Sequence, residues 1–219
     1  GVFCLISKTF AEIGFDVFIP LLKYMFCVLL ALGVQCFGVY MSMLKIFSGL
    51  NPIIFIKNFF PVMAFAFSTS TSNATIPMNI DTLAEKMGVS KKISSFTIPL
   101  GATINMDGTA IMQVIAAMFV AVSSGYKVTF MSMAIIAVLA LIASIGTPAA
   151  PGAGAVILFT ILTGMGYTND AALLAYSLIL AINRPIEMLV TSLNVVGDAS
   201  TSVIVAKKEN MLDEEIYHR

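Results

Sequence analysis

The sequence predicts an all-α, polytopic membrane protein, and its composition is the first reason. Of its 219 residues, 58% are hydrophobic and 11% are charged, whereas about a quarter of the residues in soluble proteins are charged. Uncharged runs such as residues 24–44 and 58–80 are long enough for the roughly 20 residues that a helix needs to cross a bilayer. Polar breaks within the later runs are tolerated at membrane depth only where they face protein or a cavity. We therefore expect two re-entrant helical hairpins among the spanning helices.

Charge and cysteine content exclude other classes of protein. Twelve basic and twelve acidic residues give a net charge of zero, so no basic surface for nucleic acid is expected, and the lipid bilayer is the expected partner. The three cysteines, Cys4, Cys27 and Cys36, lie in apolar sequence without metal-ligand spacing. We interpret them as small buried hydrophobic residues.

The chain divides into three regions. Residues 1–50 are expected to hold two transmembrane helices, the first of them partial, because the apolar start at Gly1 has no basic signal-peptide region. We interpret the sequence as a piece of a longer protein. Residues 51–206 are expected to form a core domain, and the charged residues 207–219 are expected to form a cytoplasmic tail.

Two hairpins are expected in the core domain, at residues 52–88 and 129–166. The first follows the turn signal Asn51-Pro52 and has a hydroxyl-rich tip within residues 67–77. The second has two prolines and three glycines within residues 143–154, which forbid a regular helix. We expect both tips to lie at mid-depth in the membrane, where they must face protein or water.

A broken helix over residues 92–124 carries the polar stretch GATINMDGT at residues 101–109. Asp107 has no charged neighbour within residues 93–126, and an ionised carboxylate at membrane depth costs several kcal/mol unless it is paired. The groups around it offer amide, hydroxyl and carbonyl oxygens, which suit a hard cation such as sodium. We expect the helix to unwind here and expose its carbonyl groups to an ion.

The last helix, expected over residues 169–206, carries a polar stripe at steps of three or four residues. The stripe consists of Arg184, Glu187, Thr191, Asn194 and Asp198. Arg184 and Glu187 are spaced to form a purely structural ion pair. Asp198 has no basic neighbour, and together with Asn194 it is placed to meet Asn105 across the bundle in a cage of oxygens.

The order of the elements suggests an inverted repeat. A hairpin followed by a helix with a polar centre occurs twice, and such repeats place binding sites at the membrane midplane. If the first hairpin opens to the cytoplasm, the lysines within residues 45–92 and Lys207 and Lys208 lie inside, with Lys127 outside. This distribution follows the positive-inside rule and predicts a multi-pass protein of the cell (inner) membrane.

Three rival functions fit parts of this pattern. An intramembrane aspartyl protease would use Asp107 and Asp198 to activate water, but neither aspartate lies in a GxGD sequence. An ion channel could be lined by hydroxyl and carbonyl groups. A channel needs no closing hairpin, so the breaks in both hairpins favour a carrier. The third is a structural fragment without activity of its own.

Taken together, the motifs resemble the dicarboxylate/amino acid:cation (sodium) symporters, the family of the glutamate transporters and their archaeal homologues. The matching motifs are ATIP at residues 74–77, PLGATINMDGT at 99–109, ASIGT and PGAG within 143–154, and NVVGD at 194–198. The resemblance covers the C-terminal half of the family. It implies a sodium-coupled secondary active symporter rather than an enzyme, with a transport domain that moves against a homotrimeric scaffold in the full-length parent protein.

The resemblance also implies the site residues. One sodium site is implied at Gly101, Asn105, Asn194 and Asp198, a second at Thr103, Ser144, Ile145 and Thr147, and part of a third at Asn105 and Asp107. The remaining ligands of the third site are expected outside this sequence. The implied substrate site comprises Ser72, Asn73, Thr109, Ala150, Gly154, Glu187, Val190, Thr191 and Asn194.

Departures from the family pattern bear on the substrate. Carriers of acidic amino acids in the family have a pocket arginine at one of two positions that here hold Val190 and Ser70. A buried substrate carboxylate without this donor costs several kcal/mol, which favours a neutral or small polar amino acid. Glu187 stands where the family has an aspartate that holds the substrate's amino group. Sodium- or proton-coupled symport of glutamate, aspartate or C4-dicarboxylates is the alternative, because Arg184 lies on the same stripe.

Overall fold

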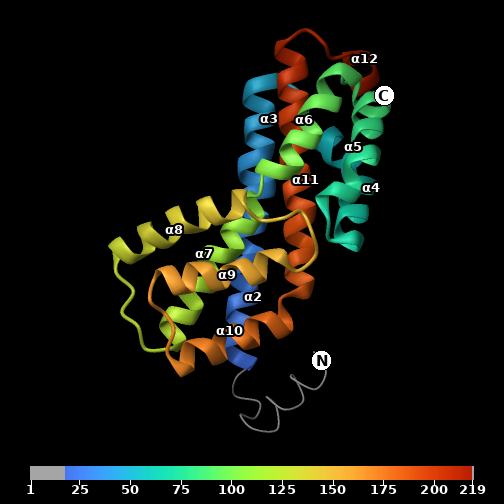
Figure 1. The fold of residues 1–219 in the computed structure, drawn as a ribbon. Helices are drawn as coiled ribbons and strands as arrows, with labels where there is room; N and C mark the ends of the chain where they lie inside the picture. The colour runs from blue at the N-terminus through green and yellow to red at the C-terminus, as the bar shows by residue number, and fades with distance from the viewer. Residues whose placement is uncertain (1–17, 219) are drawn as a thin grey trace.

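The computed structural model describes residues 18–218, and the regular elements in this part are helices (Figure 1). One isolated β-bridge pairs Val89 with Leu212. The predicted all-α class is confirmed, while the partial helix expected within residues 1–50 begins outside the described residues. Among the described residues, four helices are long and apolar enough to cross a membrane: Ile19–Ser48, Pro52–Thr69, Lys91–Ser123 and Arg184–Lys208. A multi-pass membrane protein is therefore supported by length and composition.

The first long rod consists of α2 (Phe18–Gly33), the π-helix η2 (Val34–Tyr40) and α3 (Met41–Ser48). Large apolar side chains are exposed along it, including Phe26, Leu30 and Phe37, as expected for a surface that faces lipid. The rod ends at Gly49, whose φ of 73° is the left-handed conformation that glycine adopts readily. The π-helical segment was not predicted.

The first helix pair consists of α4 (Pro52–Thr69) and α5 (Ser72–Met87), which pack against each other. Asn51 caps α4, because its Oδ1 accepts a hydrogen bond of 2.9 Å from the backbone N–H of Ile53. Ser70 ends α4 in the left-handed region, with φ 51°, so the chain reverses direction at the hydroxyl-rich tip.

The broken helix has the form that the sequence predicts. Helix α6 (Lys91–Ile104) and helix α7 (Asp107–Ser123) are separated at Asn105 and Met106, whose backbone angles lie outside the helical region. The second helix pair follows as α8 (Phe130–Ile145) and α9 (Ala153–Gly164), with non-helical backbone between them. The re-entrant insertion of both pairs, their inverted repeat and the domain boundaries stay predictions.

The last part of the chain differs from the single helix expected over residues 169–206. It forms α10 (Asp170–Ile182) and α11 (Arg184–Lys208), which run in different directions and meet at Asn183 (Figure 1). The physical reason is Pro185, which lies in the first turn of α11. Proline is tolerated there, but inside a continuous helix it would remove a hydrogen bond and clash with the preceding turn.

Helix α11 is the core of the structure. It contacts α2, η2, α3, α4, α5, α6 and α7, and its residues 190–200 are all buried. The part of the polar stripe from Thr191 to Asp198 is therefore enclosed by other helices, whereas Arg184 at its start is exposed. This is the position in which a buried charge needs a partner.

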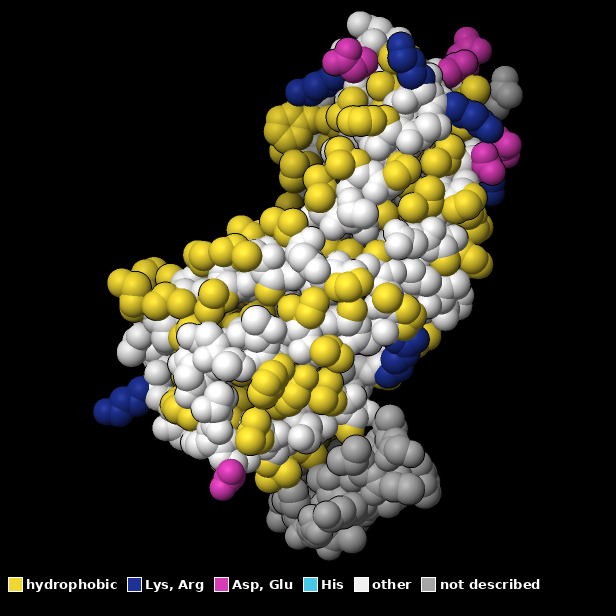
Figure 2. All heavy atoms as spheres, in the orientation of Figure 1, with side chains coloured by type: hydrophobic (Ala, Val, Ile, Leu, Met, Phe, Trp, Pro, Cys, Tyr) yellow, Lys and Arg dark blue, Asp and Glu magenta, His cyan; other side chains and the backbone are white. Residues whose placement is uncertain are grey.

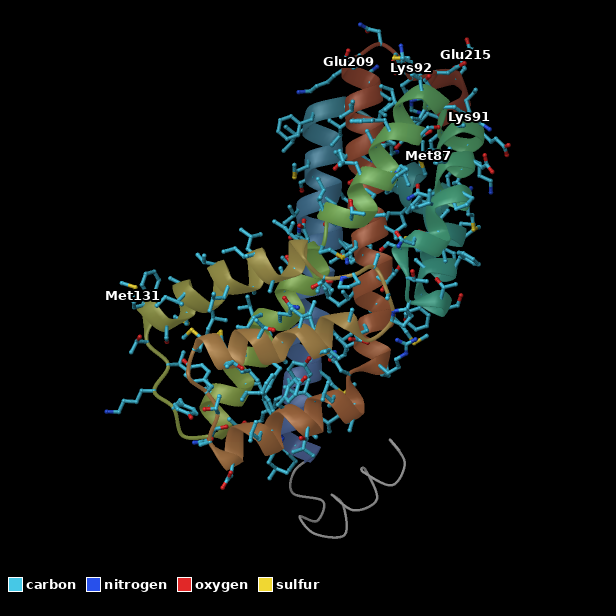
Figure 3. The ribbon with its side chains drawn as sticks, viewed as in Figure 1. Met87, Lys91, Lys92, Met131, Glu209 and Glu215 are labelled. Carbon is cyan, nitrogen blue, oxygen red and sulfur yellow. The ribbon has the colours of Figure 1, made fainter. Side chains whose placement is uncertain are left out.

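Charged side chains gather mainly at one end of the molecule, while the flanks are largely hydrophobic (Figure 2). Lys91, Lys92, Glu209 and Glu215 lie together at this end, and Met131 lies far from them at the start of α8 (Figure 3). The short helix α12 (Glu214–Tyr217) folds back here, and the Tyr217 hydroxyl donates a hydrogen bond of 3.0 Å to the Asn51 carbonyl. The charge distribution fits a molecule that spans the membrane with its charged end in water.

Candidate functional site

The break between α6 and α7 faces the middle of α11. Asn105 Nδ2 donates a hydrogen bond of 2.8 Å to Asp198 Oδ1 and one of 3.1 Å to the Asn194 carbonyl. Gly101 lies against the same carboxylate, because a Cβ at this position would overlap Asp198 Oδ1. The structure thus brings together the four residues expected to form the first cation site.

The Asp198 carboxylate has little compensation for its charge. The residue is 4% exposed, and among residues 18–218 it takes part in no ion pair. Its side-chain donor, Asn105 Nδ2, is neutral, so the buried negative charge is not offset, which is costly. The Asp198 carboxylate and the Asn194 carbonyl oxygen both contact this amide nitrogen, and both are oxygen ligands. This set fits a hard monovalent cation such as sodium, whose charge would offset that of Asp198.

Asp107 begins α7 beside this cluster and is half-buried. Its Oδ2 accepts hydrogen bonds from the Tyr40 hydroxyl at 2.9 Å and from Gln35 Nε2 at 3.3 Å. Both donors belong to η2. Neither donor was predicted from the sequence, although each is a polar side chain in an otherwise apolar helix.

A pocket of about 30 Å³, partly open to solvent, lies between the tips of the two helix pairs, beside α7 and α11. The Thr71 hydroxyl donates a hydrogen bond of 2.6 Å to the Ala149 carbonyl and so joins the two tips. The lining residues are Ser70, Ser72, Met106, Thr109, Met112, Thr147, Pro148, Ala149, Ala150, Gly152, Gly154, Glu187, Val190, Thr191 and Asn194.

All the predicted substrate residues line this pocket except Asn73, which is exposed and lies outside it. Asn73 follows Ser72 on α5, and a helix turns by about 100° at each residue, so the two side chains face different ways. Sequence reasoning missed the contributions of Met106, Met112 and Gly152, and it assigned Thr147 to a cation site. The methionines were indistinguishable from ordinary apolar residues in the sequence.

Glu187 connects α11 to the second helix pair. Its Oε1 accepts a hydrogen bond of 3.1 Å from the backbone N–H of Ala155, in the first turn of α9. Its Oε2 lies 3.7 Å from an Arg184 guanidinium nitrogen. The Arg184 side chain is 51% exposed and is not among the pocket-lining residues, so this ion pair forms at the edge of the pocket.

The residues of the second predicted cation site are not joined to one another by side-chain hydrogen bonds. The hydroxyl groups of Thr103, Ser144 and Thr147 each donate to a carbonyl of the same or the adjoining helical turn, at 2.8, 2.9 and 2.8 Å, and Ile145 is 52% exposed. Helices α6 and α8, which carry three of these residues, contact each other. The second cation site stays a prediction.

Comparison with known proteins identifies the relatives of this chain. The profile of the sodium:dicarboxylate symporter family matches residues 1–208. An excitatory amino acid transporter of Caenorhabditis elegans is 34% identical over 207 residues, which cover 94% of this chain and 40% of the relative. The neutral amino acid transporter B(0) of Mus musculus is 36% identical over 202 residues, which cover 91% of this chain and 36% of the relative.

A third relative is the human excitatory amino acid transporter 5, which is 37% identical over 156 residues that cover 71% of this chain and 27% of the relative. The chain thus spans two fifths or less of the length of these relatives. All three are transporters, which confirms the prediction that the chain is not an enzyme and removes the intramembrane protease from consideration. The chain belongs to the sodium:dicarboxylate symporter family.

Proposed function

We propose that this chain is the substrate-binding part of a sodium-coupled symporter for a neutral or small polar amino acid. One observation carries the proposal. Among the described residues, the lining of the pocket between the helix tips contains one acidic side chain, Glu187, and no basic side chain. The pocket also shares Asn194 with the cluster of Asn105 and Asp198. A zwitterionic substrate without a charged side chain matches such a pocket.

The two ends of an amino acid find different partners in this pocket. The ammonium group pairs with the Glu187 carboxylate, and Thr109, Thr191 and Asn194 complete the polar wall. The main-chain carboxylate lies between the tips, where α5 begins at Ser72 and α9 begins at Ala153. Helix N-termini present free backbone N–H groups and a positive dipole end to an anion.

The side-chain end of the pocket favours a neutral substrate. Val190 contributes no hydrogen-bond donor, and Ser70 contributes one hydroxyl that is buried and has no partner among the described residues. A hydroxyl left in this state costs about 1–3 kcal/mol, and a polar substrate atom would satisfy it. An acidic substrate remains the second candidate, because the half-exposed Arg184 is close enough to Glu187 to turn towards the pocket edge.

Coupling between ion and substrate follows from shared residues. The Asn194 side chain lines the pocket and holds the backbone N–H of Gly108 at 2.8 Å, while the Asn194 carbonyl accepts from Asn105 in the cation cluster. A cation that orders this region therefore also orders the substrate site. By linkage, the substrate strengthens cation binding by the same factor.

Transport itself is proposed for the full-length protein, with residues 51–206 as its moving domain, in a homotrimer of the cell membrane. The test is uptake of labelled serine, alanine, aspartate and glutamate into proteoliposomes, with and without an inward sodium gradient. Sodium-driven uptake of a neutral amino acid is the expected result. Sodium-driven uptake of aspartate alone would replace the substrate assignment, and sodium-independent uptake of all four would overturn the proposed coupling.

Val190→Arg should create affinity for aspartate in the same assay. The new guanidinium would offer a bidentate, charge-assisted contact to the substrate's side-chain carboxylate. Such bonds contribute about 1.5–3 kcal/mol, so aspartate affinity should rise roughly 10- to 100-fold. Val190→Met is the matched control, because it adds length without charge and should leave aspartate affinity low. Equal aspartate binding by both variants would show that position 190 does not face the substrate side chain.

A further inference from the structure

The π-helix η2 interrupts the first rod at the level of the broken helix. In a π-helix the backbone hydrogen bonds join residues five apart, and π segments inside α-helices occur frequently at functional sites. Gln35 and Tyr40, at either end of this region, are five residues apart. In a regular α-helix five steps of about 100° would turn them roughly 140° away from each other. The π-helical winding instead lets both side chains reach the same atom, Asp107 Oδ2.

The hydrogen bonds from described side chains to the Asp107 carboxylate reach only one of its two oxygens. Tyr40 and Gln35 donate to Oδ2 at 2.9 and 3.3 Å, and hydrogen bonds from the side chains of residues 18–218 reach this oxygen but not Oδ1. The two donors fix the carboxylate plane from one side. Because both donors are neutral, the negative charge of Asp107 is still uncompensated, and its second oxygen is available to a cation.

A close approach at Gly197 provides an independent observation. A Cβ at Gly197 would lie 2.6 Å from the Tyr40 hydroxyl and 2.5 Å from Asn105 Nδ2, so only a glycine lets these two groups meet α11 here. Tyr40 therefore stands between Asp107 and the cluster of Asn105 and Asp198. This packing places one hydroxyl between the half-buried carboxylate of Asp107 and the buried carboxylate of Asp198.

We propose that Gln35 and Tyr40 are positioning residues for cation binding at Asp107, and that the π-helical winding of η2 directs both side chains to the Asp107 carboxylate. The proposal rests on the sodium-coupled function proposed above. Carboxylates that bind metal ions are commonly held by hydrogen bonds from outer residues, and loss of such a partner lowers metal affinity about 10- to 100-fold. Here the hydrogen-bond donors to the carboxylate, Gln35 and Tyr40, come from the first rod. One face of this rod therefore supports the cation site, in addition to the apolar surface that the rod exposes.

The experiment is a sodium titration of the thermal unfolding temperature of the purified full-length transporter, without substrate. Tyr40→Phe should raise the half-saturating sodium concentration about 10- to 100-fold, and Gln35→Leu should raise it in the same direction. Tyr24→Phe is the matched control. It removes a buried hydroxyl from the same rod, where Tyr24 donates a hydrogen bond of 2.7 Å to Asn183 Oδ1, so it should lower the unfolding temperature without changing the sodium dependence.

A double-mutant cycle separates positioning from a general structural role. In an Asp107→Asn background, Tyr40→Phe should cause no further shift in half-saturating sodium, because the group that Tyr40 orients has lost its charge. An equal shift in both backgrounds, or a Tyr40→Phe protein with the wild-type sodium dependence, would overturn this inference alone. A wild-type protein that sodium does not stabilise would overturn the proposed function and this inference together.

Discussion

Gly101→Ala should weaken sodium binding by about 10- to 100-fold and should remove most sodium-driven uptake. The added methyl group would overlap Asp198 Oδ1 and lie 2.8 Å from Asp198 Cγ, so the carboxylate would have to leave its position beside Asn105. The measurement is the sodium dependence of the thermal unfolding temperature in the full-length transporter. Uptake in proteoliposomes provides the functional readout.

The control for this substitution is Gly33→Ala, at the end of α2. Apart from its chain neighbours and the backbone of its own helix, a Cβ at Gly33 meets no atom within 4 Å, and replacing a helical glycine with alanine stabilises a protein by about 0.5–1 kcal/mol. The control should therefore keep the wild-type sodium dependence and unfold at the same or a higher temperature. If Gly101→Ala also kept the wild-type sodium dependence, Asp198 would not belong to a cation site.

Glu187→Gln should lower substrate affinity by about 10- to 100-fold. The substitution removes a charge-assisted contact to the substrate ammonium, and such contacts contribute about 1.5–3 kcal/mol. Sodium affinity without substrate should change little, because Glu187 bonds to Ala155 and Arg184 rather than to the cation cluster. Substrate-dependent thermal stabilisation at saturating sodium measures the effect.

Glu187→Asp is the matched variant, since it keeps the charge and shortens the side chain by one methylene. It should bind substrate more tightly than Glu187→Gln does. If both variants bound substrate as the wild type does, the ammonium group would have to bind elsewhere. Loss of binding in Glu187→Asp alone would indicate that the hydrogen bond to Ala155, rather than the charge, is the contribution that matters.

Much of the site was predictable because its signals are local. The stretch from Gly101 to Thr109 combines glycine, amide and carboxylate groups in apolar sequence, and the structure breaks the helix at Asn105 as expected. The tip residues Ser72 and Ala150, predicted to bind substrate, line the pocket, and their part in binding stays a prediction. Asn73 does not, because its side chain faces away from the pocket. That orientation depends on how α5 packs, and a run of hydroxyl and amide residues does not reveal it.

Other features depended on non-local geometry. The bend at Asn183 follows from Pro185. This proline is visible in the sequence, but a single helix was predicted across it. The π-helix has no comparable marker, because apolar residues with one glutamine and one tyrosine fit an α-helix equally well. The wider turn of the π-helix is stabilised by the hydrogen bonds of Gln35 and Tyr40 to Asp107, which lies 72 and 67 residues further along the chain.

The sequence by itself determined the membrane class, the positions of the polar breaks and the residue types at the candidate site. These properties follow from hydropathy, charge and the backbone restrictions of proline and glycine, which act over short stretches of chain. Only the tertiary structure decided which oxygens meet. Asn105 and Asp198 are separated by 93 residues and Asn105 and the Asn194 carbonyl by 89, so their contact depends on how α6 and α11 pack, which no local pattern specifies.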